Sequence, residues 1–146
     1  MPEPRVDPQH CQFQLRVGRS KIHRWGVYAE ELIPRGRKIV EYTGERISRR
    51  ETKRRASASD LNYLFTLDKY WTLDGSVGGS GAEYINHCCD PNVAARVVRG
   101  HILYFAKRDI RPGEELTVDY HFAREVEKVP CACGAGKCRG TINVER

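Results

Sequence analysis

The apolar residues of this chain fall in short runs that glycine and proline interrupt. The chain has 146 residues with 13 Gly and 7 Pro, and its longest unbroken apolar run extends only from Ile102 to Ala106. Runs of this length between turn residues are typical of brief strands and leave little room for long helices. The length fits one compact domain with a small appendage. The sequence therefore predicts a mainly β fold (β-rich α+β) of many short strands.

Two turns and one helix punctuate this pattern. Arg99-Gly100 and Asp68-Lys69 are predicted to close hairpins. Ser48 with Glu51 makes a capping box, so a helix is predicted from Ser48 to about Ser59, and a second short helix is expected near residues 81–86. The predicted strands are Gly26–Ala29, Ile39–Tyr42, Tyr63–Asp68, Tyr70–Asp74, Ala94–Val98, Ile102–Ala106 and Leu116–Tyr120.

The charge balance is basic, with 25 Lys and Arg against 19 Asp and Glu and a formal net charge of +6. This favours acidic partners but is also common on ordinary domains. The densest cluster, residues 49–55, follows the capping box and fits either a solvated helix face or a phosphate-contacting patch. No apolar run approaches the roughly 18 residues of a membrane span, and the first residues lack the apolar core of a signal peptide. We expect an intracellular protein with no membrane contact.

Cysteine placement points to a metal. Of the six Cys, three lie close together near the C-terminus, at 131, 133 and 138, and two are adjacent at Cys88 and Cys89. Cys131 and Cys133 are too close for an easy disulfide, whereas clustered thiolates around a glycine turn can hold one metal. Zinc sites are usually tetrahedral, so Cys88 or Cys89 is expected to complete a four-cysteine site and Cys11 to stay free. The alternative is a disulfide in an oxidising compartment.

Six segments occur in an order that resembles a known family. They are residues 24–29 (RWGVYA), 39–45 (IVEYTGE), 62–65 (NYLF), 84–92 (YINHCCDPN), 113–120 (GEELTVDY) and 131–140 (CACGAGKCRG). Each is weak alone, but together they resemble the SET-domain protein lysine methyltransferases with a zinc-binding post-SET tail. The resemblance covers about residues 15–144. It implies a SET fold of several short sheets with a knot-like C-terminal segment and a zinc-stapled tail.

The resemblance also implies a domain division and a set of roles. Residues 1–14 would be an N-terminal arm, 15–122 the SET domain and 127–146 the post-SET zinc-binding segment. The cofactors would be S-adenosylmethionine and one structural Zn²⁺. Cofactor contacts fall on His23, Arg24, Trp25, Tyr63, Asn86 and His87; catalytic roles on Tyr120 and Tyr42; the lysine channel on Phe65 and Val118; and metal ligation on Cys89, Cys131, Cys133 and Cys138.

These residue types suit methyl transfer to a lysine. The amine attacks a sulfonium methyl only when it is neutral, and aromatic or apolar walls favour loss of its proton. A narrow channel then aligns the reacting atoms, with Tyr120 as the electrostatic and positioning element. No strong general base is apparent, so the proton is expected to leave through water.

The chain departs from the family pattern at four positions. Arg24 replaces the first Gly of a Gly-x-Gly turn, which leaves the local backbone path in question. Ser80 stands where Asn is typical, and Glu83 stands where Arg is typical, so cofactor contacts could be weaker there. Val118 occupies a position that Phe or Tyr usually fills, and its smaller side chain favours di- or trimethylation.

The partner implied is a lysine-containing protein, most often a histone. Histone tails are basic like this domain, so either a local acidic groove or a basic face that contacts nucleic acid would be needed. The location would be the nucleus in a eukaryote, or the cytoplasm or a host cell in a bacterium. The main alternative is a non-catalytic zinc-stapled module that binds peptide or nucleic acid on the same fold. A zinc-ribbon nucleic-acid binder would need a second cysteine pair.

Overall fold

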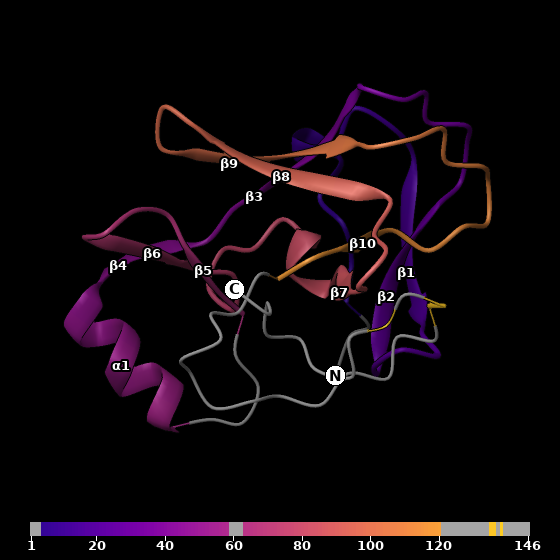
Figure 1. Cartoon of the computed structure of the whole chain (residues 1–146). Helices are drawn as coiled ribbons and strands as arrows, with labels where there is room; N and C mark the ends of the chain where they lie inside the picture. Colours follow the sequence, from indigo (N-terminus) through magenta and orange to yellow (C-terminus); the bar gives the residue numbers. More distant parts are fainter. Residues whose placement is uncertain (1–3, 59–62, 121–134, 137, 139–146) are drawn as a thin grey trace.

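The computed structural model describes residues 4–58, 63–120, 135–136 and 138 (Figure 1). Its elements follow in the order η1 (Pro8–His10), β1 (Leu15–Arg19), β2 (Trp25–Ala29), β3 (Lys38–Tyr42), β4 (Glu45–Ser48), α1 (Arg49–Ala58), β5 (Leu64–Thr66), β6 (Trp71–Asp74), η2 (Ala82–Tyr84), β7 (Asn86–His87), β8 (Val93–Val98), β9 (His101–Ala106) and β10 (Thr117–Val118). The predicted strand-rich fold is confirmed. Among the described residues, no helix has the length and apolar composition of a membrane span.

The strands of the described residues form three small sheets. One is the β1-β2 pair, one has the order β4-β6-β5, and the largest has the order β3-β9-β8-β10-β7. Strand β10 runs parallel to both neighbours, with Val118 opposite His87 on one side and Val93 on the other. Because β7 and β8 are consecutive in sequence, residues 88–92 join them across β10. This crossing brings the C-terminal strand beside Asn86 and His87.

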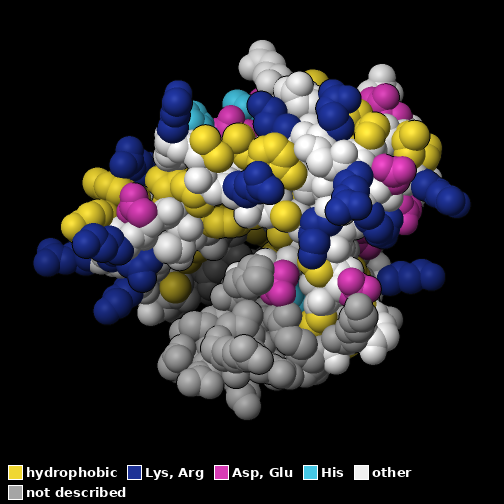
Figure 2. All heavy atoms as spheres, turned by 45° about the horizontal axis from the view of Figure 1, so that its top comes forward, with side chains coloured by type: hydrophobic (Ala, Val, Ile, Leu, Met, Phe, Trp, Pro, Cys, Tyr) yellow, Lys and Arg dark blue, Asp and Glu magenta, His cyan; other side chains and the backbone are white. Residues whose placement is uncertain are grey.

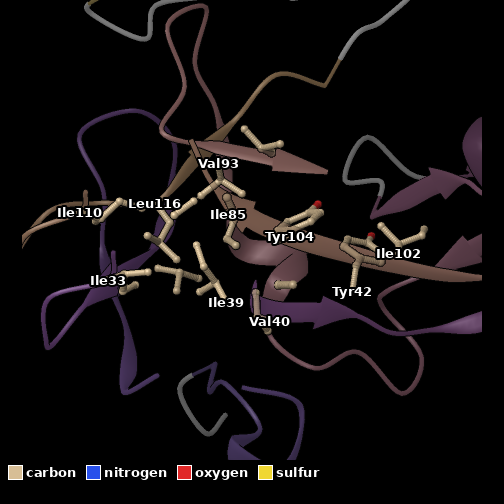
Figure 3. Close-up of a cluster of buried hydrophobic side chains, with 14 of the residues drawn as sticks. Ile33, Ile39, Val40, Tyr42, Ile85, Val93, Ile102, Tyr104, Ile110 and Leu116 are labelled. Atoms are coloured by element: carbon tan, nitrogen blue, oxygen red, sulfur yellow. The ribbon is translucent and has the colours of Figure 1, made fainter. Parts of the chain in front are cut away.

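The core lies between these sheets and is mostly aliphatic. Strand β9 shows the two-residue period of a half-buried strand, with Ile102, Tyr104 and Ala106 buried and the alternate residues more exposed. Figure 3 shows the cluster, in which two tyrosines, Tyr42 and Tyr104, lie near Ile102 and away from Ile33 and Ile110. The largest fully buried aliphatic side chains are Val27, Ile33, Ile39, Val40, Ile85, Val93, Ile102, Ile110 and Leu116.

The predicted turns and strands are largely confirmed. Arg99 and Gly100 have φ angles of 51° and 81°, and they close the β8–β9 hairpin with the positive angles of a tight two-residue turn. Residues 67–70 close the β5–β6 hairpin. The second short helix is a single 3₁₀ turn, Ala82–Tyr84. Strands β1 and β4 were not predicted; β4 has only Ile47 as an apolar residue, and pairing with β6 makes it a strand.

Helix α1 is attached by charge rather than by apolar contact. None of its residues is buried, as predicted for a solvated helix. The Glu51 N–H donates to Ser48 Oγ at 3.2 Å, which forms one half of the predicted capping box. Arg55 Nη1 lies 2.6 Å from Glu45 Oε1 on β4 and 2.8 Å from Asp74 Oδ2 on β6. Arg55 therefore anchors the helix to the β4-β6-β5 sheet.

Candidate active site

The buried side chain of Asn86 fixes the turn that follows β1. Asn86 Nδ2 lies 3.2 Å from the carbonyl oxygen of His23 and 2.9 Å from that of Trp25. It also lies 3.0 Å from Glu115 Oε2 and 3.1 Å from Ser20 Oγ. An amide nitrogen has only two N–H donors, so these acceptors share them. The predicted cofactor residues of the turn and of β7 are thus brought together, and the amide of Asn86 bonds to the protein itself.

Arg24 adopts the conformation that a glycine would take. Its φ angle is +41°, in the left-handed region that a side chain disfavours. The Ser20 N–H donates to the Arg24 carbonyl at 3.0 Å and closes the turn. Arg24 therefore takes a backbone conformation that glycine adopts freely, at a strain of about 1 kcal/mol.

Restoring the glycine should relieve this strain. We expect Arg24→Gly to raise the free energy of unfolding by roughly 0.5 to 1 kcal/mol, because relief of the left-handed conformation exceeds the added entropy of the unfolded chain. Urea unfolding of the variant and the original chain measures this difference. Arg24→Ala is the control, since alanine removes the charge and keeps the strain. Equal stabilisation by both variants would mean that charge, not backbone strain, is relieved.

Glu115 and Ser20, which sequence reasoning did not assign, complete this network. Glu115 accepts hydrogen bonds from Ser20 Oγ at 2.8 and 2.9 Å, in addition to its contact with Asn86. A Cβ on Gly26 would lie 2.4 Å from Glu115 Oε2, so a larger residue there would displace this carboxylate from its present position. The Gly-Glu-Glu segment was noted as a motif, but nothing in it indicated that Glu115 reaches a turn far away in the sequence.

His87 is buried and held between β10 and Cys89. The Tyr120 backbone N–H donates to His87 Nδ1 at 3.1 Å, while Asp119 Oδ1 is more distant at 3.5 Å. Because a backbone N–H can only donate, the neutral ring carries its proton on Nε2, which lies 3.4 Å from Cys89 Sγ. His87 therefore connects the Tyr120 backbone to the sulfur of Cys89.

The two predicted catalytic tyrosines both donate to backbone carbonyl groups. Tyr120 is 39% exposed, and its hydroxyl donates to the Ile85 carbonyl at 2.9 Å. The hydroxyl of buried Tyr42 donates to the carbonyl of Tyr63. Burial raises the pKa of both phenols above the usual range of tyrosine, and for Tyr120 the nearby Tyr63 adds to the rise in pKa. Both hydroxyls thus stay neutral near pH 7.

Aromatic rings pack around Tyr42. Phe65 lies 5.2 Å and Tyr104 lies 6.2 Å from the Tyr42 ring, centroid to centroid. Tyr63 packs edge-on against Tyr84 at 5.6 Å. The predicted channel residue Phe65 therefore lies beside a predicted catalytic tyrosine, while Val118, the other, is buried on β10.

The four predicted metal ligands are only partly described. Cys131 and Cys133 lie outside the described residues, while Cys89 and Cys138 lie within them. Cys88 is buried, and its sulfur lies 3.4 Å from the Asp90 backbone nitrogen, whereas the sulfur of Cys89 faces His87. No group of three or more metal-ligating side chains occurs among the described residues.

Ser80 and Glu83, which also depart from the family pattern, form hydrogen bonds within their own part of the chain. The buried Ser80 hydroxyl donates to the Glu41 carbonyl at 2.5 Å and accepts from the Ala82 N–H at 3.3 Å. Glu83 Oε1 accepts the Gly81 N–H at 2.8 Å, and burial raises the pKa of Glu83. A Cβ on Gly79 would lie 2.5 Å from Glu83 Oε2, so this carboxylate packs against the glycine loop.

The fold and the site define a class of protein. Residues 24–121 match the family model of the SET domain, and the chain belongs to this family. Relatives carry more specific names. The chain is 42% identical over 141 residues to a Saccharomyces cerevisiae protein named "Histone-lysine N-methyltransferase, H3 lysine-4 specific". It is 40% identical to "Histone-lysine N-methyltransferase SETD1" of Drosophila melanogaster. It is 41% identical to a Schizosaccharomyces pombe protein that has the same name as the Saccharomyces cerevisiae protein.

The match covers most of this chain and little of the relatives. It includes 88% of the chain and 13% of the yeast protein, and 89% of the chain and 8% of the fly protein. For the Schizosaccharomyces pombe protein the shares are 89% and 15%. The chain thus spans only a small part of the length of these relatives.

Proposed function

We propose that this chain transfers a methyl group from S-adenosylmethionine to a lysine side chain of a protein, and that the protein is histone H3. The observation that carries the proposal is the placement of Tyr120. Its backbone is held by His87 and its hydroxyl by Ile85, both beside the Asn86 network. The names of the relatives support histone H3, and specifically lysine-4, as the target.

The residues present fit such a cofactor. Strand β7 is the outermost strand of the five-stranded sheet, and the backbone of a strand at a sheet edge can bind polar groups of a ligand. Arg24 offers a cation for a ligand carboxylate, and Trp25 and Tyr63 offer ring faces. When bound, S-adenosylmethionine supplies an activated methyl group on a sulfonium. We assign His23, Arg24, Trp25, Tyr63, Asn86 and His87 to holding it.

The chain's own groups then prepare the lysine amine. Buried rings such as Phe65 and Tyr42 disfavour a charged ammonium, so the amine loses its proton to water. The Tyr120 and Tyr42 oxygens, which cannot ionise near neutral pH, act as hydrogen-bond acceptors and not as bases. Tyr120 is the electrostatic element beside the transferring methyl group, and weak contacts from that methyl to carbonyl oxygens are a second-order contribution.

We also propose one structural zinc held by Cys89, Cys131, Cys133 and Cys138. The proton on His87 Nε2 lies toward Cys89 Sγ, and a metal-bound thiolate is a good acceptor for such a donor. Cys88, buried beside Asp90, is the less suitable of the adjacent pair. The zinc would make residues 127–146 a unit that closes over the site of the SET domain, residues 15–122, behind the arm of residues 1–14.

The basic surface is proposed to contact nucleic acid beside the histone. Figure 2 shows Lys and Arg side chains spread over one face of the molecule. The carboxylate of Asp74 is paired with Arg55 and so contributes little negative charge to a groove for a basic histone tail. The yeast and fly origins of these relatives, whose names say that they methylate histones, support a nuclear location. DNA binding that weakens steeply with salt would support this contact.

The proposed activity is tested by labelled methyl transfer to a mixture of core histones. Label in histone H3 supports the proposal. Cofactor binding by calorimetry without any transfer would instead support the non-catalytic module, and absence of both would exclude the enzyme.

A further inference from the structure

Tyr104 on β9 has a buried ring and a hydroxyl without a hydrogen bond to any described residue. Its exposed fraction is 2%. Among the described residues, the one buried side-chain nitrogen or oxygen that has no partner is Thr72 Oγ1. Since the Tyr104 hydroxyl also has no partner there and is not among those buried atoms, this oxygen retains accessible surface. A polar atom at the end of a buried ring in this position is available to a ligand.

The surroundings of Tyr104 are those of the proposed lysine channel. Its ring centroid lies 6.2 Å from Tyr42 and 6.3 Å from Phe65. Figure 3 shows the oxygen ends of Tyr104 and Tyr42 turned away from Ile33 and Ile110. The pKa of Tyr104 lies well above its usual range through burial first, and then through the nearby Tyr120 and Glu83. The Tyr104 ring therefore packs with Tyr42 and Phe65, the residues assigned to the proposed site and channel.

Small neighbours give this ring its room. In the sheet register, Tyr104 lies opposite Ala95 on β8 and Val40 on β3. The next strand beyond β8 carries Val118, the position at which the small side chain favoured several methyl groups. A tyrosine between small residues fills part of the space that they leave, and it adds a hydrogen-bond acceptor.

We propose that Tyr104 is a specificity-determining residue of the lysine channel, which limits how many methyl groups the target lysine receives. This rests on the proposed methyl transfer. An amine with N–H groups can donate to the Tyr104 oxygen, but each added methyl removes one donor and adds bulk. A channel wall that carries this hydroxyl therefore binds the less methylated amine more tightly than the more methylated one. The small Val118 is offset by Tyr104, so the chain adds fewer methyl groups than Val118 alone predicts.

Tyr104→Phe tests this inference because it keeps the ring and removes only the oxygen. Wild type, Tyr104→Phe and Tyr70→Phe are incubated with histone H3 to completion, and mass spectrometry gives the ratio of higher to single methylation. We expect that ratio to rise several-fold in Tyr104→Phe and to stay at the wild-type value in Tyr70→Phe, whose residue is 62% exposed. Thermal unfolding should be unchanged, since no hydrogen bond to a described residue is lost.

A binding measurement separates this inference from the proposed function. H3 peptides with unmodified and trimethylated lysine-4 are titrated into each protein, and Tyr104→Phe should shift the affinity ratio toward the trimethylated peptide. Unchanged product and affinity ratios in Tyr104→Phe would overturn the inference while leaving methyl transfer intact. If wild type transfers no methyl group, the proposed function fails, and the affinity ratios alone decide the role of Tyr104.

Discussion

Replacing Tyr120 by phenylalanine should lower the rate of methyl transfer by about 100-fold or more while changing cofactor affinity little. The variant keeps the ring, its 5.4 Å contact with His87 and the backbone hydrogen bond to His87 Nδ1. It loses the hydroxyl that is aligned by the Ile85 carbonyl. In the proposed mechanism that oxygen stabilises charge mainly in the transition state, so its loss should appear in kcat and not in binding.

The measurement is kcat by labelled transfer, with calorimetric titration of S-adenosylmethionine alongside. Tyr70→Phe is a matched control, because the same atom is removed at an exposed turn. A Tyr120→Phe variant with wild-type kcat would remove the mechanism. An equal loss of affinity and rate would instead make Tyr120 a cofactor-binding residue.

Substitution of the adjacent cysteines should give opposite results. We expect Cys89→Ser to lose bound zinc and most methyl transfer, and Cys88→Ser to keep both, because the sulfur of Cys89 faces His87 while Cys88 is buried near Asp90. If the proposed zinc couples residues 127–146 to the site, a chelator should have the same effect as Cys89→Ser. Zinc content by mass spectrometry and transfer to histone H3 are measured on both variants.

The β core should survive loss of the metal, since the cluster around Ile39, Ile85 and Ile102 contains no cysteine ligand. Circular dichroism during chelation checks this. Full turnover by metal-free protein would contradict the zinc proposal, and simultaneous loss of zinc and of all β structure would show that the metal holds the whole fold.

Much of the fold was predictable because turn chemistry and apolar period are local signals. Arg99-Gly100 marks its hairpin by residue type alone, and β8 and β9 follow from it. Strand β4 was missed since its order comes from pairing with β6, which no local pattern reveals. The crossing of residues 88–92 over β10 was implied only by the family resemblance.

The candidate site also has residues that sequence motifs identified and residues whose roles depend on long-range contacts. Motif order brought Asn86, His87 and Tyr120 into one hypothesis, and the structure places Tyr120 against His87, the residue that follows Asn86. Glu115 and Tyr104 were not found, because their roles depend on distances between segments far apart in the chain. The unusual Arg24 could be noticed from the sequence, but its positive φ could be seen only in three dimensions.

The most direct test of the central claim compares two substrates in one assay. Histone H3 and an H3 variant with arginine in place of lysine-4 are incubated with the chain and labelled S-adenosylmethionine, and the modified residue is located by mass spectrometry. The account predicts methylation of lysine-4 in the first and loss of the label in the second. Equal labelling of both, or cofactor binding with no labelling of either, would contradict it.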